Sequence, residues 1–521
     1  MRFAGTIHDL RYYRAVYQTL SGRCCSEMTH QNHPEKYDVI IIGAGFSGIG
    51  MGIKLKEAGL DNFLILEGAD SIGGTWRDND YPGCACDIPS HLYSFSFEPS
   101  PDWSRMFPAQ DEIWTYLKHC VDKYGLTPYL SLNSNVDKAV FDEDALDWKV
   151  TTDDGRSFAG RALVSGMGGL SRPAYPDIPG LSHFKGSCFH SARWDHSFKF
   201  HDKTVAVIGT GASAIQFVPQ IVDDVKSLLL FQRTPPWIVP KLDRPIRSWE
   251  RWLYRYVPLA RFLFRNFIYW RQEVRGIGFT IDPRLMGHAN KIALEHLEKQ
   301  VADEQLRNNL TPDYTIGCKR ILISCDYYPA LQRDNLSLIM TGIREITADS
   351  IVDDDGHEHK IDAIVLGTGF RATDPISPTR IFGIGGRELS HDWQNGPEAF
   401  LGINVAGYPN FFLLVGPNTG LGHNSMIFMI ESQVRYTIKM LRKMSEEDIQ
   451  AVDVKADSQE QFNRNLQRIL AKSVWQSGCK SWYQTEDGKN SSIWPGPAFS
   501  YWARTLRPDM RHYNVTGRRN R

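Results

Sequence analysis

Two glycine-rich turns carry the residue types that could bind nucleotides in this chain. The first turn contains Gly43, Gly45, Phe46, Ser47 and Gly48, and the second contains Gly209, Thr210, Gly211, Ala212, Ser213 and Ala214. Glycine lets a backbone bend sharply and approach a pyrophosphate, whose charge then lies at the N-terminus of the next helix. Two nucleotide sites in one chain indicate electron transfer between a nicotinamide and a flavin.

The residue that closes the next apolar run differs between the two turns. Glu67 follows the apolar residues 63–66, and Arg233 lies just after the apolar residues 228–231. A carboxylate at this place accepts hydrogen bonds from ribose hydroxyls, whereas a guanidinium meets a 2′-phosphate. The first turn is therefore predicted to bind FAD or NAD, and the second NADP.

The segments around each turn predict the elements that position it. β-Branched runs over 37–42 and 204–208 precede the turns, and helix-like stretches over 49–57 and 215–221 follow them. A single such turn can bind nothing, but two complete βαβ contexts disfavour that alternative. We predict an α/β protein with two Rossmann-like dinucleotide-binding domains, one for FAD and one for NADP, with a helical insertion in the NADP domain.

Punctuation by proline and glycine suggests the domain boundaries. We predict an N-terminal extension over 1–36, an FAD-binding domain over 37–168, an NADP-binding domain over 169–365 with a helical insertion at about 241–309, and a return to the FAD domain over 366–521, which includes a C-terminal segment closing over the substrate. The strand-like run before Gly367 and Gly369 looks like the chain returning to the first domain. Residues 408–418 are expected to add another buried strand and a loop.

Composition is typical of a large globular enzyme. The chain has 521 residues, of which 42% are hydrophobic, and a formal net charge of -1, which gives no argument for nucleic acid or membrane as a global partner. Nine cysteines are scattered without paired metal-ligand spacing, so no metal is predicted. This usage fits reduced thiols in a cytoplasmic protein. Nothing in the sequence indicates the oligomeric state.

Two segments allow more than one interpretation. Residues 1–36 hold several arginines and few acids, which would suit a transit peptide, but they lack an apolar core and are expected to be a poorly ordered extension. Residues 249–270 are rich in aromatics, yet arginines interrupt them too often for a transmembrane segment. They could lie on a membrane surface as a basic amphipathic helix. A helix that packs its aromatic face against the protein is the expected arrangement.

Two further motifs carry a family resemblance. Phe184 to Asp195 fits FxGxxxHxxxW followed by Pro or Asp, and Gly74 to Asp87 fits GxWxxxx(F/Y)P(G/M)xxxD. In both motifs, over about residues 37–505, the chain resembles the type I Baeyer–Villiger monooxygenases. Flavin monooxygenases that oxidise nitrogen or sulfur, or hydroxylate small molecules, remain the alternative, although they carry Tyr or Phe in place of Trp194. With Asp195 at the end of the first motif, the chain resembles the branch that includes 4-hydroxyacetophenone monooxygenase.

The resemblance implies a reaction and roles for particular residues. FAD and NADPH would be the cofactors, and one oxygen atom from O2 would enter next to the carbonyl of a small-molecule ketone to give an ester or lactone, a step that would suit secondary metabolism. Arg320 would be the catalytic positive charge, oriented by Asp87. Gly74, Thr75, Trp76 and Asp87 would lie at FAD, while Arg233, Thr234 and Lys319 would hold the 2′-phosphate. His190 would position the moving nicotinamide unit rather than transfer protons.

Two rival classes remain to be separated. Cys84 and Cys86 raise the possibility of a disulfide reductase, but thiols with one residue between them have poor geometry for a disulfide. A flavin-binding sensor without turnover is the other rival. The full set of phosphate-binding and oxygen-activating residues argues against it. Consumption of NADPH by the purified protein would distinguish an enzyme from a sensor.

Overall fold

The computed structural model describes residues 35–280, 283–371, 376, 378–479, 481–485 and 487–517. Residues Lys36–Arg521 form one compact unit, and residues 1–35 are separate from it. Of residues 1–35, only Glu35 is among the described residues. The predicted poorly ordered extension over residues 1–36 therefore lies outside the described residues, apart from its last two positions.

The larger sheet holds the first glycine-rich turn. Its strand order is β17-β4-β5-β6-β1-β2-β3, with β18 paired to β6. The strands are β1 (Glu35–Ile42), β2 (Phe63–Leu66), β3 (Leu130–Ser131), β4 (Val136–Asp142), β5 (Asp147–Thr152), β6 (Ser157–Ser165), β17 (Arg380–Phe382) and β18 (Phe411–Leu413). The pairs β1–β2, β2–β3, β6–β18 and β4–β17 are parallel, whereas β4–β5 and β5–β6 are antiparallel. The first turn thus follows the central parallel strand of a mixed sheet.

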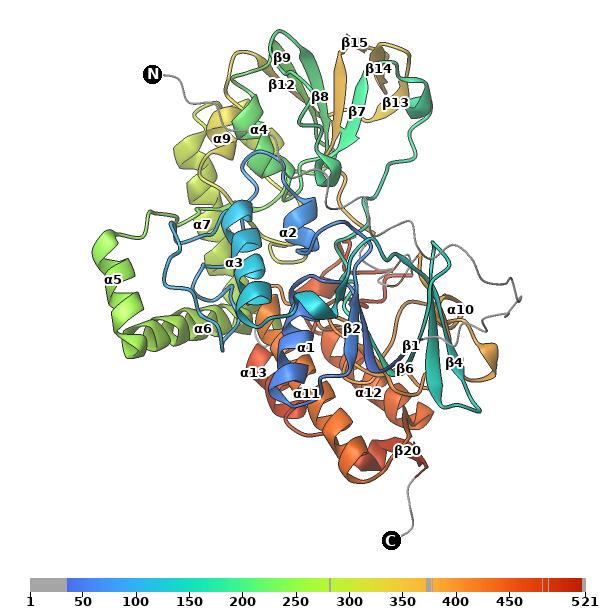
Figure 1. Ribbon diagram of the computed structural model, residues 1–521. Helices are drawn as coiled ribbons and strands as arrows, with labels where there is room; N and C mark the ends of the chain where they lie inside the picture. The colour runs from blue at the N-terminus through green and yellow to red at the C-terminus, as the bar shows by residue number, and fades with distance from the viewer. Residues whose placement is uncertain are drawn as a thin grey trace, which may run out of the picture. The chain divides into compact units, whose positions relative to one another are not determined.

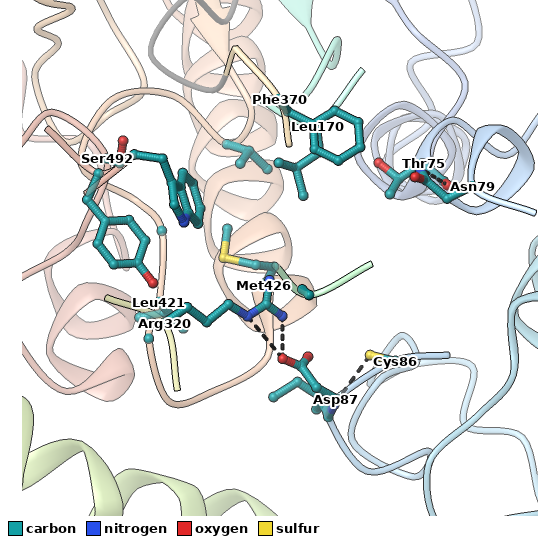
Figure 2. A pocket seen from close by; sticks show the side chains of 18 of the residues that line it. Thr75, Asn79, Cys86, Asp87, Leu170, Arg320, Phe370, Leu421, Met426 and Ser492 are labelled. Carbon is teal, nitrogen blue, oxygen red and sulfur yellow. Dashed lines mark hydrogen bonds and ion pairs between the residues drawn. The ribbon is translucent and has the colours of Figure 1, made fainter. Parts of the chain in front are cut away.

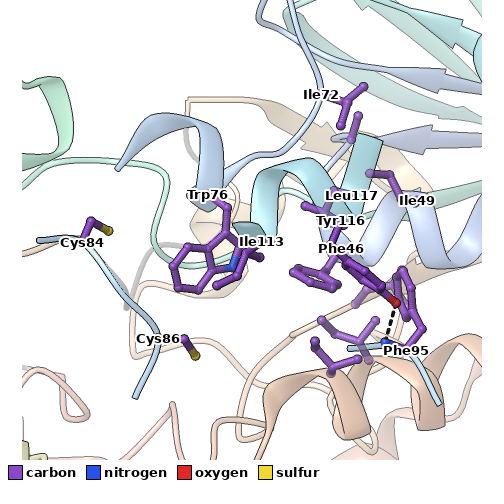
Figure 3. Close-up of a cluster of buried hydrophobic side chains, with 14 of the residues drawn as sticks. Phe46, Ile49, Ile72, Trp76, Cys84, Cys86, Phe95, Ile113, Tyr116 and Leu117 are labelled. Atoms are coloured by element: carbon purple, nitrogen blue, oxygen red, sulfur yellow. Dashed lines mark hydrogen bonds between the residues drawn. The ribbon is translucent and has the colours of Figure 1, made fainter. Parts of the chain in front are cut away.

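β1 and β2 are interior strands of this sheet and are buried on both faces. Residues Val39–Ile42 of β1 and all four residues of β2 are buried, as parallel strands covered by helices require. α1 (Phe46–Glu57) follows the turn and packs against α11 (Met426–Glu446). Figure 3 shows the adjoining core, in which the Phe46 ring lies 5.3 Å from Phe95 and 6.2 Å from Tyr116, measured between ring centroids.

The second sheet is parallel throughout and holds the second turn. Its order is β12-β9-β8-β16-β7 (Figure 1). The strands are β7 (Ser187–His190), β8 (Thr204–Ile208), β9 (Ser227–Phe231), β12 (Leu336–Ile339) and β16 (Ala363–Leu366), and α4 (Ala214–Ile221) follows the turn. An antiparallel ribbon of β13 (Ile343–Ile346), β14 (Ser350–Asp353) and β15 (Glu358–Lys360) shares a hydrophobic cluster with β8, β9 and β16. The predicted fold class is therefore confirmed: an α/β protein with two dinucleotide-binding sheets.

A mainly helical stretch interrupts the second sheet between β9 and β12. It contains β10 (Ile238–Val239), α5 (Ser248–Tyr256), α6 (Pro258–Thr280), α7 (Met286–Gln300), α8 (Glu304–Leu310), β11 (Leu322–Ile323) and α9 (Tyr327–Ala330). β10 and β11 lie near the beginning and the end of this stretch, and they pair in parallel. The two ends of the stretch are therefore side by side. This pairing brings the residues just before β11 back to the second sheet.

The remaining elements surround the first sheet. They are α2 (Thr75–Asp78), α3 (Gln110–Lys123), α10 (Leu389–Asp392), β19 (Ala451–Val454), α12 (Ala456–Leu470), α13 (Ala498–Arg504) and β20 (Tyr513–Thr516). Short 3₁₀ helices cover Thr127–Tyr129, Leu181–His183, Ser191–Arg193, Pro283–Leu285, Ile384–Gly386, Val474–Gln476 and Met510–His512. Among the described residues, no helix is both long enough and apolar enough to cross a bilayer.

The aromatic segment over 249–270 differs in part from the expectation. Trp249, Trp252 and Trp270 are 58%, 59% and 54% exposed, so these side chains are not packed against the protein. The buried face of α6 carries Ile268, Tyr269 and Phe279, and also the polar Gln272 and Glu273. The expected packing holds for Tyr254 and Tyr269, which are buried, and is wrong for the exposed tryptophans.

The point at which the chain returns to the first sheet also differs from the expectation. β16, the strand before Gly367, lies between β8 and β7 and belongs to the second sheet. Its four residues are buried and pair in register with both neighbours, which the local sequence could not reveal. The strands that rejoin the first sheet are β17 and β18, which pair with β4 and β6.

The cysteines are not all reduced. Cys318 and Cys479 form a disulfide across a sequence separation of 161 residues, with their Cα atoms 6.2 Å apart. The expectation of reduced thiols is wrong for this pair, because only the fold brings the two loops together. The free cysteines among the described residues are Cys84, Cys86, Cys120, Cys188 and Cys325, and Cys24 and Cys25 lie outside the described part of the chain.

Candidate active site

A cavity of about 340 Å³ lies where elements of both sheets meet (Figure 2). The FAD-type half contributes Thr75, Trp76, Asn79 and the segment from Tyr81 to Ile88, and the NADP-type half contributes Ala212, Ser213, Ile215, Gln216 and Arg320. Two later segments, around Val415–Met426 and around Trp482–Ile493, complete the wall. The cavity therefore combines residues that are hundreds of positions apart in the sequence.

The first glycine-rich turn has room for a ligand at one glycine only. Gly43 has a φ of 96°, and a Cβ there would lie 2.8 Å from the carbonyl oxygen of Gly166. A Cβ on Gly48 would lie 1.9 Å from the carbonyl oxygen of Gly43. Gly45 has an ordinary φ of -85°, and the nearest atom to its Cβ would be the Gly74 Cα at 3.8 Å. The space beside Gly45 is free of protein and fits the close approach of a pyrophosphate.

The second turn repeats this arrangement. Gly209 has a φ of 105°, and a Cβ there would lie 2.6 Å from the carbonyl oxygen of Gly367. A Cβ on Gly211 would lie no closer than 3.9 Å to that oxygen, so the middle glycine again borders open space. Thr210 donates from Oγ1 to the carbonyl oxygen of Thr234 at 3.3 Å. In both turns, the backbone conformation thus requires the first glycine, and the middle glycine borders the space where a ligand would lie.

Glu67 lies directly against the first turn. Its buried carboxylate accepts the Ala44 N–H at 2.8 Å through Oε2, and the Ala69 N–H at 3.1 Å through Oε1. Arg77 also donates to Oε1 at 3.0 Å. Each carboxylate oxygen can accept two hydrogen bonds, so Oε2 keeps an acceptor site for a ribose hydroxyl.

The side chains of Phe46, Ser47 and Trp76 are structural in this arrangement. Phe46 and Ser47 are buried at the start of α1. Trp76 is 9% exposed and donates from Nε1 to the Tyr93 hydroxyl at 3.0 Å. Thr75 lines the cavity next to Gly74, whose backbone approaches Gly45. The second signature therefore meets the first turn at its ligand-facing glycine.

Arg233 and Lys319 form a cationic pair beside the second turn. Burial, and then the nearby charge of Arg233, lower the pKa of Lys319 below its ordinary value. The Lys319 Nζ also lies 4.6 Å from the centre of the Tyr314 ring. No carboxylate of the described residues forms an ion pair with either cation within 4.0 Å. The charge of Asp313 also acts on Lys319, from beyond ion-pair distance. Two neighbouring cations match the charge of a phosphate.

Arg320 and Asp87 form an ion pair in the cavity wall. The Arg320 Nε donates to Asp87 Oδ2 at 3.1 Å, and Nη2 contacts the same oxygen (Figure 2). The negative charge of Asp87 raises the pKa of Arg320 above its ordinary value. This geometry leaves Nη1, with its two N–H donors, for an anionic oxygen in the cavity. The arginine that was identified by resemblance is thus fixed in place and permanently charged.

The C-terminal segment reaches this ion pair. Tyr483 is 2% exposed and lines the cavity with Trp482. Burial raises the pKa of Tyr483 to about 12, so its hydroxyl stays protonated. The disulfide between Cys318 and Cys479 ties this segment to the loop that carries Arg320. Two parts of the wall are therefore held together covalently.

Both family signatures converge on α4. The Tyr81 hydroxyl donates to Gln216 Oε1 at 2.9 Å, and Gln216 Nε2 donates to the Ala85 carbonyl at 2.9 Å. The Phe217 ring lies 6.1 Å from Tyr81 and 5.3 Å from Trp194, measured between centroids. The segment before Asp87 and the segment before β8 thus pack on one helix of the second sheet.

His190 is buried at the end of β7, away from the cavity wall. Its Nδ1 accepts the Ala192 N–H at 3.0 Å, and burial lowers its pKa to about 4. Its ring lies 5.7 Å from Tyr175 and 5.9 Å from Phe370, which borders the cavity. A neutral, fully buried imidazole is suited to positioning rather than to proton transfer.

Several wall residues were missed by reasoning from the sequence. Gln216 could have been identified from the sequence, because it is a polar residue within the apolar start of α4. The loop after β18 could have been identified as well, since Gly416, Gly420 and Gly422 follow a buried strand as in the two turns. Val415 in this loop has a φ of 61°, which is rare for a β-branched residue and typical of constrained sites. Tyr93 had no signal in its local sequence.

Cys84 and Cys86 do not form a redox pair. Both thiols are free and buried, and burial raises the pKa of Cys84 to about 12 and that of Cys86 well above its ordinary value. Reactive thiols have lowered pKa values, so these two cysteines are inert. The site lacks the chemistry of a disulfide reductase at this position.

Comparisons with known proteins agree with this geometry. A sequence profile described as pyridine nucleotide-disulphide oxidoreductase matches residues 40–250. A Baeyer-Villiger monooxygenase from Pseudomonas aeruginosa is 51% identical over 480 residues, which are 92% of this chain and 91% of the relative. Another, from Streptomyces coelicolor, is 44% identical over 488 residues, with 93% and 94% covered. A solved structure of oxidized steroid monooxygenase bound to NADP has a TM-score of 0.83 at 28% identity, and covers 92% of this chain and 100% of that chain.

The fold and the site define a flavoprotein monooxygenase with two dinucleotide-binding domains. Identity to curated relatives over nine-tenths of the chain shows that it belongs to the Baeyer–Villiger monooxygenase family. The resemblance that was drawn from the two signatures is confirmed, and so is the prediction that the protein is an enzyme.

The first turn predicts a contrast between two glycine variants. Gly45→Ala should fold with near wild-type thermal stability but lose most of its flavin. Its Cβ would make only an ordinary contact, 3.8 Å from the Gly74 Cα, but it would fill space that the pyrophosphate needs. Gly48→Ala should lower the melting temperature, because its Cβ collides with backbone. Flavin absorbance per protein and thermal melts measure both. Normal flavin content in Gly45→Ala would contradict this assignment.

The cationic pair predicts the choice of coenzyme. Arg233→Ala should raise the KM for NADPH far more than that for NADH, by about 1.5–3 kcal/mol for a lost charge-assisted contact. Steady-state kinetics with both coenzymes measure the difference, and Arg344→Ala, at an exposed position of β13, serves as a cation-removal control. Equal effects on NADPH and NADH would show that Arg233 does not bind the 2′-phosphate.

Proposed function

We propose that this enzyme inserts one oxygen atom from O2 next to the carbonyl of a ketone, and thereby forms an ester or lactone. Its cofactors are FAD and NADPH, as membership of the family implies. The observation that supports the proposal most is the Arg320–Asp87 pair in a cavity bordered by both nucleotide-type halves. A fixed cation there stabilises negative charge on oxygen.

The chain's own residues have separate roles in this proposal. FAD, when bound, supplies the reduction of dioxygen with electrons from NADPH. Gly45 and Glu67 hold the first nucleotide, while Gly211, Arg233 and Lys319 hold the second. Arg320 offers Nη1 to an anionic oxygen, and Asp87 fixes the orientation of the guanidinium through Nε and Nη2. We assign catalysis to Arg320 and positioning to Asp87.

The cavity wall favours an apolar ketone. Leu170, Phe370 and Met426 project toward the same space as Arg320 in Figure 2, and Trp482 borders it. Apolar walls exclude water from the charged oxygen and bind the hydrocarbon part of a substrate. Together with Asp195, which matches the 4-hydroxyacetophenone monooxygenase branch, this supports aryl ketones as the first compounds to test.

The proposal includes a cytoplasmic location. Five described cysteines are free, which is usual where thiols are kept reduced, and the Cys318–Cys479 pair is the exception. NADPH and O2 are both available there.

Isotope labelling tests the reaction directly. The flavin-loaded protein, incubated with NADPH, ¹⁸O₂ and a panel of cyclic, aryl and long-chain ketones, should consume NADPH and give an ester or lactone. One labelled oxygen should occupy the ring or alkoxy position, and the other should leave as water. Oxidation of amines or sulfides alone would favour the alternative flavin monooxygenase, and absence of NADPH consumption would favour a sensor.

A further inference from the structure

α6 has its apolar residues on the solvent side. Leu259, Phe262, Leu263, Phe267, Trp270 and Val274 are between 54% and 64% exposed. Their spacing of three or four residues places them on one face of the helix. The buried side of the helix holds Ile268, Tyr269 and Phe279 together with the polar Gln272 and Glu273. The helix is thus apolar on its solvent side as well as on its buried side, unlike an ordinary surface helix.

Two neighbouring helices extend this face. α5 packs against α6 and exposes Trp249, Trp252 and Tyr256 by 58%, 59% and 63%. On α13, Phe499 is 45% exposed and its ring lies 6.1 Å from Trp270. Figure 1 shows α5 and α6 at one margin of the view, with no labelled element beyond them. We call the exposed apolar residues of α5, α6 and α13 the aromatic face.

Arginines lie beside the aromatic face on α5 and along one edge of α6. The Arg265 guanidinium instead points inward and donates to the carbonyl oxygens of His91 and Ser94. Residues 248–280 contain six arginines and two acids, Glu250 and Glu273, and both acids are buried. Arg251 and Arg255 are exposed on α5, and the Arg271 guanidinium lies 6.0 Å from the centre of the Phe267 ring. Asp102, which pairs with Arg255, is the carboxylate outside this segment that meets it in an ion pair. The surface is therefore apolar and cationic at once.

We propose that the aromatic face binds the surface of a lipid bilayer that contains anionic headgroups. Exposed patches of this kind are rare on monomeric proteins unless they bind something. Tryptophan and tyrosine favour the boundary between headgroups and acyl chains, and arginine is attracted to anionic lipid. The helices would lie in the plane of the interface, as basic amphipathic helices do.

A second copy of this chain is a less favourable occupant. A symmetric dimer through this face would bring the arginines of both copies together, without an exposed carboxylate of α5 or α6 to pair with them. Anionic lipid complements both the charge and the apolar character of the face. Vesicle binding and the oligomeric state in solution separate the two occupants.

The buried side of α6 touches the cavity wall. Asn424 donates to Glu273, and a Cβ on Gly276 would lie 2.5 Å from the His423 ring. Asn424 and His423 both border the cavity. A ketone dissolved in lipid would therefore meet the protein one helix away from the site; this consequence rests on the proposed function, whereas lipid binding does not.

Vesicle flotation of the full-length, flavin-loaded protein tests the proposal. The protein should float with vesicles of phosphatidylcholine and phosphatidylserine, less with phosphatidylcholine alone, and less at high salt. Phe267→Asp should reduce the partition coefficient at least about tenfold, because an apolar anchor is replaced by a charge. Ile469→Asp is the matched control, since Ile469 is 47% exposed on α12, and it should float like the wild type.

A second readout needs no variant. Brominated lipids in the anionic vesicles should quench the fluorescence of the exposed tryptophans of the wild-type protein. Absence of both flotation and quenching would overturn the proposal, and so would equal flotation of Phe267→Asp and the wild type. A wild-type dimer in light scattering that Phe267→Asp converts to a monomer, without vesicle binding, would assign the face to a second copy. None of these outcomes depends on ester formation.

Discussion

The ion pair between Arg320 and Asp87 is the interaction on which the site depends. It joins residues 233 positions apart, one at the end of the second signature and one just before β11. An arginine in a cavity wall stabilises negative charge only if its own position is fixed, and loss of either partner leaves an uncompensated charge. The pairing of β10 with β11, and the Cys318–Cys479 disulfide, both hold the loop that carries this arginine.

The position of Asp87 depends in turn on α4. Gln216 and Phe217 on this helix contact Tyr81, and Phe217 also contacts Trp194. The two family signatures, which are unrelated in sequence, therefore meet on one helix. The signature that ends at Asp87 docks the FAD-type half on α4, and the signature that contains Trp194 packs on α4 from within the NADP-type half. A substitution at Trp194 would act on Asp87 and Arg320 through this helix, without touching either.

The local sequence pattern was sufficient to predict the strand, turn and helix of each nucleotide-binding unit. Strand, turn and helix around Gly43 and Gly209 lie within a few residues of their predicted bounds, because each has an unbroken apolar run and a glycine required by sterics. The features that the sequence did not predict depend on long-range contacts. The Cys318–Cys479 pairing, the placement of β16 and the contacts of Gln216 are set by distant strands and loops. The exposed face of α6 was misjudged because aromatic residues usually pack inward.

The central claim is that Asp87 acts through Arg320, and a double-mutant cycle tests it most directly. Ester formation would be measured for Asp87→Ala, Arg320→Ala and the double variant, with flavin content as the check on folding. We expect that Arg320→Ala keeps its flavin and loses at least about 10² in rate. We also expect that the double variant is no slower than Arg320→Ala alone. The claim would be contradicted if the rate losses of the two single variants multiplied in the double variant. A wild-type ester yield from Arg320→Ala would also contradict it.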